Sequence, residues 1–386
     1  MLSVMTGPTA VKDRALGPDL ARGLLLLFIA LANIHGFLHP PGVGDIRAMP
    51  IPAALPDRIV AFLETTLVDG RSYTMFAALF GYGMVQIARR QTGEWKSTRK
   101  LLRRRALWLV LLGLLHAVLL YYGDILTAYG LIALVLVSAI RWSDPRLLVS
   151  AAVLALFGSW AFAFLSTPNP PDSAAEMYPW ALDHNPLLGM AGRAFAIGIS
   201  APVLAVTAAG AVLFGIWAAR RGLYEHPEQH RQTLRRMVAI GVPLSFLGGI
   251  PLALYTSGLL PATDANVIPV AGLHALTGFA GGPAYAALIA LWSLRVRRTP
   301  VITAIQATGQ RSLTCYLTQS VVWTVLFAPF LLDLGGSMTL WQSVILAAAT
   351  WAFTVFLADL MRRRGLRGPF EVLLRRLTYR DQTARQ

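Results

Sequence analysis

Long apolar segments follow one another along the whole chain, and short polar stretches separate them. Windows of about 20 apolar residues, each able to cross ~30 Å of hydrocarbon, can be placed ten times. The predicted spans are 20–38, 71–88, 106–122, 125–140, 146–165, 202–219, 237–259, 273–294, 312–332 and 339–360. Two shorter apolar segments, 58–68 and 187–199, are predicted to be interfacial helices. The pattern predicts an all-α, polytopic protein, in which residues 1–386 form one integral membrane domain with about ten transmembrane helices.

The basic residues indicate an orientation for these spans. Most of the 34 Lys and Arg residues lie in the N-terminal segment, in alternate loops and in the tail after residue 361. The positive-inside rule assigns that side to the cytoplasm. Both termini, with a basic tail over 361–386, are therefore predicted to be cytoplasmic, and 166–201 is predicted to be an extracytoplasmic loop. This distribution accounts for the formal charge of +15 without a nucleic-acid partner.

Composition narrows the class further. Hydrophobic residues make up 55% of the chain and charged residues only 14%, which is too apolar for an ordinary soluble domain. The single cysteine, Cys315, excludes an intrachain disulfide and a multi-cysteine metal cluster, and no metal is expected. No small-residue cleavage site follows the first apolar segment, so that segment is predicted to be retained rather than removed as a signal peptide.

The first predicted span carries polar groups on one face. Arg22 and Asn33 are 11 residues apart, which at 100° per residue leaves them ~20° apart around the helix and ~16.5 Å apart along it. Asp19 precedes Arg22 by three residues and can pair with it. The simpler interpretation is a boundary ion pair, with Asn33 bonded to a neighbouring helix.

A second group of polar residues lies in the predicted outer half. His35 and His116 fall at similar depth, with His39 just beyond the first span. Asp124 follows His116 by eight residues, ~12 Å along a continuous helix, so a bend or a water chain would be needed to join them. Intramembrane ionisable groups usually face a cavity or pathway. The alternative is that each histidine is a packed, hydrogen-bonded core residue.

The ninth span begins with a polar run that includes Gln310 and Arg311. Arg311 is either a boundary anchor or an anion contact, because a guanidinium binds phosphate through two hydrogen bonds. Arg103 and Arg104 belong to a basic run before the third span. No phosphate loop of the Walker type, Gly-x-Ser-x-Gly elbow or His-Glu-x-x-His pair occurs in the sequence.

Several of these stretches resemble one bacterial family. They are "DLARGLLLLFIALANI", "FAALFGYGM", "RRRALWLVLLGLLHAVLLYYGDILTAYGL", "TGQRSLTCYLTQS" and "RGPFEVLLRRLTY". Together they resemble the YeiB family of membrane proteins (domain of unknown function 418), most strongly over 14–140 and 301–380. The resemblance implies a protein of the bacterial cytoplasmic (inner) membrane.

That family in turn distantly resembles transmembrane acyltransferases. Acyltransferase type 3 proteins carry Arg-x10-His in the first span, whereas this chain has Asn33 where that histidine would stand. Heparan-alpha-glucosaminide N-acetyltransferase is more similar, with Arg-Gly, an Asn at the same spacing and a catalytic His shortly beyond it. This resemblance implies that His35 or His39 takes the catalytic role here.

Three hypotheses follow. The first is an acyl-CoA-dependent O- or N-acyltransferase that acts on an extracytoplasmic glycan or lipid acceptor, with catalytic candidates His35, His39, His116 and Asp124. Its acyl-CoA contacts would be Arg22, Asn33, Arg103, Arg104, Arg311 and Gln310. The second is a transporter or flippase of a small or lipid-linked substrate, and the third is a sensor or assembly scaffold. Membrane lipids are expected partners of each, and the sequence leaves a homodimer open.

Overall fold

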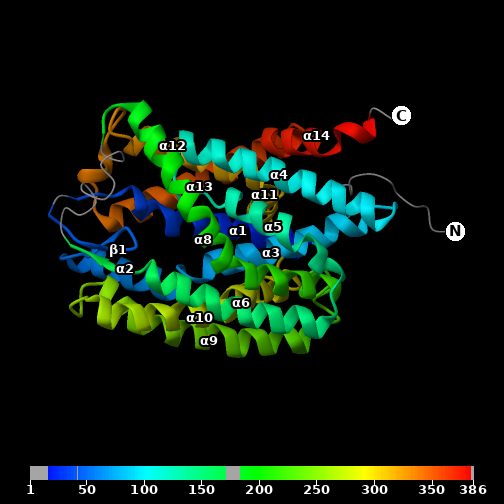
Figure 1. The fold of residues 1–386 in the computed structure, drawn as a ribbon, viewed down its shortest axis with the longest axis horizontal. Coiled ribbons are helices and arrows are strands. Elements are labelled where there is room, and N and C mark those ends of the chain that lie inside the picture. The colour runs from blue at the N-terminus through cyan, green and yellow to red at the C-terminus, as the bar shows by residue number, and fades with distance from the viewer. Residues whose placement is uncertain (1–15, 41, 171–182, 384–386) are drawn as a thin grey trace.

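The computed structural model describes residues 16–40, 42–170 and 183–383 (Figure 1). Its α-helices are α1 (Leu16–Ile34), α2 (Leu55–Leu67), α3 (Arg71–Arg89), α4 (Trp95–Leu119), α5 (Leu126–Leu136), α6 (Asp144–Phe164), α8 (Pro186–Arg220), α9 (Arg231–Thr256), α10 (Asp264–Ser293), α11 (Pro300–Gln310), α12 (Ser312–Phe327), α13 (Leu340–Arg363) and α14 (Pro369–Thr383). Short 3-10 helices are η2 (His35–Phe37), η3 (Val137–Arg141) and η5 (Leu334–Gly336). Strands β1 (Asp45–Ile46), β2 (Met49–Pro50) and β3 (Pro168–Asn169) form an antiparallel sheet in the order β2-β1-β3. The predicted all-α class is confirmed for the described residues.

The long helices run side by side along the longest axis of the molecule, with α1 near the middle (Figure 1). Six of the described helical segments are long and apolar enough to cross a membrane: α1 with η2, α6, α8, α9, α10 and α13. The segment α5 with η3 and the helix α12 are apolar but shorter. Length and composition thus support six of the ten predicted spans.

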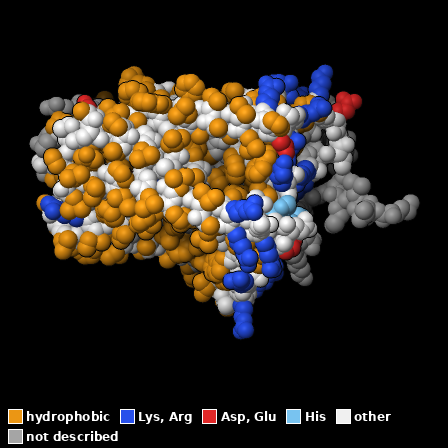
Figure 2. Space-filling view, turned by 90° about the horizontal axis from the view of Figure 1, so that it is seen from below, with side chains coloured by type: hydrophobic (Ala, Val, Ile, Leu, Met, Phe, Trp, Pro, Cys, Tyr) orange, Lys and Arg blue, Asp and Glu red, His pale blue; other side chains and the backbone are white. Residues whose placement is uncertain are grey.

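The surface has the character of a membrane protein. Hydrophobic side chains cover most of the face in Figure 2, and Lys and Arg side chains gather at one end. Large apolar side chains such as Val135 and Phe195 are 76% and 72% exposed. Apolar surface of this extent marks contact with lipid or another apolar partner. The chain is therefore an integral membrane protein.

Two regions outside the ten predicted spans contain long helical segments. The predicted loop 166–201 becomes α8 from Pro186 onward, because the expected interfacial helix and the following span join into one 35-residue helix. Pro202 lies inside this helix, where it removes one backbone hydrogen bond without ending it. Residues 171–182 of that loop lie outside the described residues. The predicted basic tail contains α14, whose Glu371 accepts hydrogen bonds from the backbone of Leu313 and Thr314 at 2.8 and 3.1 Å.

A break between α2 and α3 places charged groups inside the bundle. Gly70 adopts a left-handed backbone conformation (φ +74°), and a Cβ there would lie 2.7 Å from Nε2 of His274. Glycine is therefore needed at position 70 for two reasons: it adopts the left-handed backbone of the turn, and it lets His274 of α10 approach the backbone closely. The turn leaves Asp69 and Arg71 on either side of Gly70, facing the same neighbour.

The helices α1 and α11 approach each other through glycine. A Cβ on Gly309 would overlap the carbonyl oxygen of Asp19, and a Cβ on Gly23 would overlap that of Ile305. Small residues let helix backbones pack this closely inside a membrane protein. The crossing fixes the position of Asp19 relative to the end of α11.

We expect Gly309→Ala to destabilise the protein by roughly 1–3 kcal/mol, because the added methyl group forces two backbones apart. Gly198→Ala is the matched control, since a Cβ at Gly198 meets no atom within 4 Å and alanine favours the helix. Thermal unfolding of the two variants in the same detergent measures the difference. Equal melting temperatures would contradict the close crossing.

Candidate active site

A pocket of about 360 Å³ lies between α1, α3, α4, α5, α11, α12 and α14. Along α3 its lining residues run from Phe76 to Arg90, which is ~21 Å of helix. Arg22, Arg90 and Arg105 line one end, which we call the mouth. The opposite end, the floor, is formed by aromatic and aliphatic side chains: Phe76, Leu109, Leu126, Tyr129 and Tyr316. The lining also includes Asp19, Glu225 and Glu371, so the pocket is charged at the mouth and apolar at the floor.

Asp19 organises the mouth. Its Oδ1 lies 3.2 Å from Nη1 of Arg22, one helical turn away, and its Oδ2 accepts a 3.1 Å hydrogen bond from Nε2 of Gln310. The predicted Asp19–Arg22 pair is confirmed. The structure also brings Arg22 and Gln310, two predicted acyl-CoA contacts, to the same pocket.

Two carboxylates of the pocket wall hold neighbouring elements. Glu225 accepts a 2.8 Å hydrogen bond from Gln86, and Glu371 accepts one of 2.5 Å from Thr314 Oγ1. Glu371 thus caps the N-terminus of α12, where backbone N–H groups attract negative charge. The C-terminal helix α14 is thereby fixed as one wall of the pocket.

Behind the floor lies a chain of three hydrogen-bonded side chains. His116 Nδ1 is 2.8 Å from Asp124 Oδ1, and His116 Nε2 is 2.8 Å from Ser320 Oγ. Asp124 Oδ2 accepts a 2.7 Å hydrogen bond from the backbone N–H of Thr127. The His116 and Asp124 side chains are almost fully buried, at 1% and 0% exposure. We call these three residues, Ser320, His116 and Asp124, the triad.

The direct His116–Asp124 contact is made by a bend, one of the two possibilities that the ~12 Å helical spacing left open. That distance assumed a continuous helix, but α4 ends at Leu119 and the chain folds back before α5 begins at Leu126. Only Gly123 and Asp124 lie between the predicted spans 106–122 and 125–140, so the sequence predicts a tight hairpin around Tyr122-Gly123-Asp124. The structure confirms it, and this turn returns Asp124 to His116. Ser320 was not singled out, although it closes the polar run at the start of the ninth span.

Tyr316 connects the triad to the pocket. It lines the floor, and its ring centroid is 5.0 Å from that of His116. The backbone of Ile125 lies near its hydroxyl group, but that buried hydroxyl forms no hydrogen bond of regular geometry with the described residues. Tyr316 therefore stands between the floor of the pocket and His116.

The other predicted contacts lie elsewhere. Arg103 is exposed, and neither it nor Arg104 lines the pocket, whereas the adjacent Arg105 does. Arg311 is buried and donates to the carbonyls of Ala307 and Leu366 at 3.1 and 2.5 Å, so it holds the chain between α13 and α14. Asn33 is half-buried and is not a lining residue.

His35 and His39 are separate from the triad. Nε2 of His39 lies 3.8 Å from Asp333, and burial lowers the pKa of His39 although that carboxylate opposes the shift. His35 lies within the electrostatic influence of Asp69 and Arg47, and its buried Nδ1 has no hydrogen-bond partner among the described residues. The predicted single polar layer is thus divided between different parts of the molecule.

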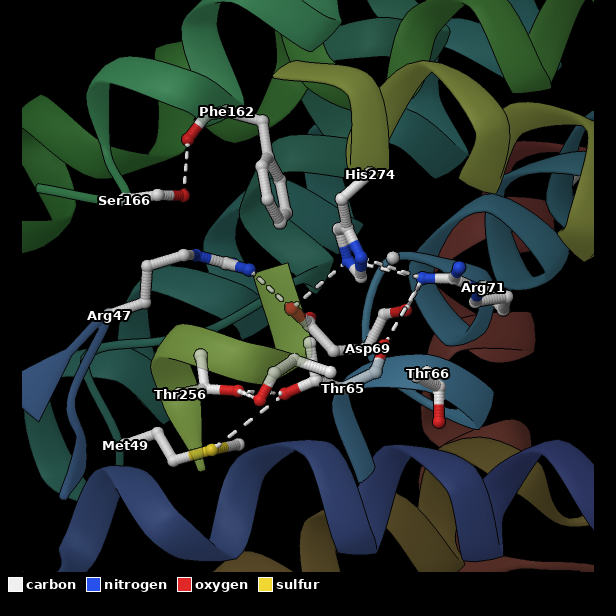
Figure 3. Close-up of polar contacts among 12 residues, drawn as sticks. Arg47, Met49, Thr65, Thr66, Asp69, Arg71, Phe162, Ser166, Thr256 and His274 are labelled. Atoms are coloured by element: carbon white, nitrogen blue, oxygen red, sulfur yellow. Dashed lines mark hydrogen bonds and ion pairs between the residues drawn. The ribbon is translucent and has the colours of Figure 1, made fainter. Parts of the chain in front are cut away.

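A second polar cluster, drawn in Figure 3, surrounds Asp69; Arg71 and His274 are fully buried in it, and Arg47 and Asp69 are half-buried. Arg47 Nη1 lies 2.7 Å and His274 Nε2 lies 3.5 Å from Asp69 Oδ2. Arg71 Nη1 lies 2.9 Å from His274 Nδ1, and Arg71 also donates to the carbonyl of Ser245. We call these four residues, Arg47, Asp69, Arg71 and His274, the Asp69 cluster. The sequence signal for this cluster is His274, an ionisable residue inside the predicted span 273–294.

The fold and these sites define a helical membrane protein with an internal pocket that is charged at one end. Residues 218–381 match the family described as "Protein of unknown function (DUF418)". The predicted relation to the YeiB family is confirmed: the chain is 28% identical to "Uncharacterized protein YeiB" of Escherichia coli (strain K12), over 95% of this chain and 97% of that protein. It is 24% identical to "Uncharacterized protein YxaH" of Bacillus subtilis (strain 168), over 96% of both chains.

Proposed function

We propose that this protein is a transmembrane acyltransferase that moves an acyl group from cytoplasmic acyl-CoA to a hydroxyl or amine acceptor on the other side of the bacterial inner membrane. The observation that supports this best is the pocket, which runs from three arginines to Tyr316 and the His116 ring. In this proposal the chain crosses the membrane ten times, with both termini in the cytoplasm. The basic end in Figure 2 is then the cytoplasmic end.

The pocket matches the chemistry of an acyl-CoA. The phosphates of coenzyme A would bind Arg22, Arg90 and Arg105, because guanidinium groups form strong, charge-assisted hydrogen bonds to phosphate. The pantetheine arm and acyl chain would lie along the apolar wall formed by α3, α4 and α5. The thioester would then reach the floor, next to His116.

His116 is suited to general-base catalysis. The Asp124 carboxylate accepts a hydrogen bond from the Nδ1–H group of His116, which keeps the ring proton on Nδ1. The lone pair of Nε2 is then directed at Ser320. A base oriented by a buried carboxylate is the usual way in which an alcohol is activated for acyl transfer. The acceptor would be an extracytoplasmic glycan or lipid.

We expect Arg105→Ala to weaken acetyl-CoA binding about tenfold or more, because it removes a charge-assisted contact to phosphate. Lys96→Ala, on the exposed side of the same helix, removes the same charge and is expected to change the affinity little. Isothermal titration of acetyl-CoA into the two purified proteins compares them. Equal affinities would argue against donor binding at this mouth.

A transporter is the second candidate, favoured by the Asp69 cluster. Buried ionisable groups inside a membrane protein often serve ion or proton pathways. This hypothesis predicts uptake of a substrate into proteoliposomes with no covalent change and no dependence on acyl-CoA. If the protein takes up a substrate in this way and does not react with acyl-CoA, the transporter hypothesis replaces the acyltransferase proposal.

A further inference from the structure

Ser320 is joined to His116 in the arrangement of an activated nucleophile. Because the Asp124 carboxylate accepts a hydrogen bond from Nδ1–H, Nε2 is the unprotonated nitrogen, and the Ser320 hydroxyl donates to it over 2.8 Å. Nucleophile, base and orienting carboxylate come from three different elements: α12, α4 and the turn before α5. Catalytic triads are recognised by this geometry and these roles, not by their order in the chain.

The triad is held by its surroundings. Both carboxylate oxygens of Asp124 have donors, one from the ring and one from the Thr127 backbone. Gly113 makes room for the start of α5, since a Cβ there would lie 2.5 Å from Asp124 Oδ2. The imidazole therefore has one orientation and one tautomer, as a base that acts on Ser320 requires.

Tyr316 separates Ser320 from the pocket. It precedes Ser320 by one helical turn on α12, and Ser320 itself is 1% exposed and is not a lining residue. A rotation of the Tyr316 side chain would bring the floor of the pocket into contact with Ser320. The hydroxyl of Tyr316 could then donate to the oxygen of a carbonyl group placed there, because it has no regular hydrogen bond with the described residues.

We propose that Ser320 carries the acyl group between donor and acceptor, an inference that rests on the proposed acyltransferase function. Ser320 Oγ attacks the thioester carbonyl, its proton passes to His116 Nε2, and the C–S bond breaks as the serine ester forms. The departing thiolate takes that proton and leaves as free coenzyme A. In the second step the acceptor hydroxyl or amine attacks the ester, gives its proton to His116 Nε2, and Ser320 regains it.

This mechanism separates the two substrates in time. Coenzyme A can leave toward the mouth before the acceptor binds, so one triad can serve donors and acceptors from opposite sides of the membrane. The expected kinetic pattern is ping-pong, with an acyl-enzyme that forms in the absence of acceptor.

The test is to incubate the purified full-length protein with acetyl-CoA, quench it in acid and search for acetylated peptides by mass spectrometry. We expect one acetyl group on Ser320, which is absent from Ser320→Ala and His116→Ala. Transfer by Ser320→Ala should fall by at least ~10³-fold. Ser343→Ala, at a buried serine on α13 whose hydroxyl donates to the Leu340 carbonyl, is the matched control and should behave as the wild type.

A further variant distinguishes loss of the nucleophile from misfolding of Ser320→Ala. Ser320→Cys keeps a nucleophile of similar size, and its acetyl group should be released by neutral hydroxylamine because it is a thioester. If Ser320→Ala transfers acetyl groups within about twofold of the wild-type rate, or if the acetyl group is found on His116, the role of Ser320 is excluded and the acyltransferase proposal stands. If the wild-type protein neither binds nor turns over acyl-CoA, both proposals fall.

Discussion

Purified protein carrying Asp124→Asn is expected to lose acyl transfer by roughly 10³-fold or more while it keeps its fold and its affinity for acyl-CoA. The asparagine amide would donate to Nδ1 of His116, so the ring proton would move to Nε2. Nε2 would then point a hydrogen, not a lone pair, at Ser320. The turnover number at saturating acetyl-CoA measures this loss.

Asp264→Asn is the matched control, because it makes the same chemical change at an exposed position in the first turn of α10. It should leave turnover unchanged. An Asp124→Asn variant that retains wild-type turnover would show that His116 is a packed core residue and not a base.

The second large effect concerns stability. We expect Arg71→Ala to lower the free energy of unfolding by about 3–5 kcal/mol, the usual cost of removing one partner from a buried charged network. The Arg71 side chain is fully buried and bonds to the backbone of Thr65, Asp69 and Ser245 as well as to His274. Its loss would leave three carbonyl groups without this donor.

Arg298→Ala, an exposed arginine between α10 and α11, is the control for loss of a positive charge. Thermal unfolding of the two variants in one detergent gives the comparison. Equal melting temperatures would mean that the Asp69 cluster contributes little to the fold and would strengthen a purely functional role for it.

Much of the fold could be predicted from the sequence because spans, charge and turns leave local patterns. The apolar windows gave the positions of most long helices, and Tyr122-Gly123-Asp124 gave the hairpin. Arg22 and Gln310 were expected at one site because both are polar residues at the same predicted boundary. The join of 187–199 to the following span in α8 was not predicted; Pro202 lies at the junction, and the helix continues through it.

The candidate site was predictable only in part, because it is built from contacts distant in sequence. His116 and Asp124 were both named, but helical spacing could not show that the chain reverses between them. Arg105 belongs to the predicted basic run before the third span, and Ser320 belongs to the polar run of the ninth. Only the folded structure shows that these members of the two runs meet the pocket and His116. His274 needed the close approach of α10 to Gly70, which no spacing in the sequence indicates.

The most direct test is the release of free coenzyme A from acetyl-CoA by the purified protein, with an added amine or sugar as acceptor. The proposed mechanism predicts steady release by the wild type, a fall of roughly 10³-fold in His116→Ala, and substantial activity in His35→Ala and His39→Ala. No release by the wild type would contradict the acyltransferase function. Full activity in His116→Ala would contradict the site assigned to it.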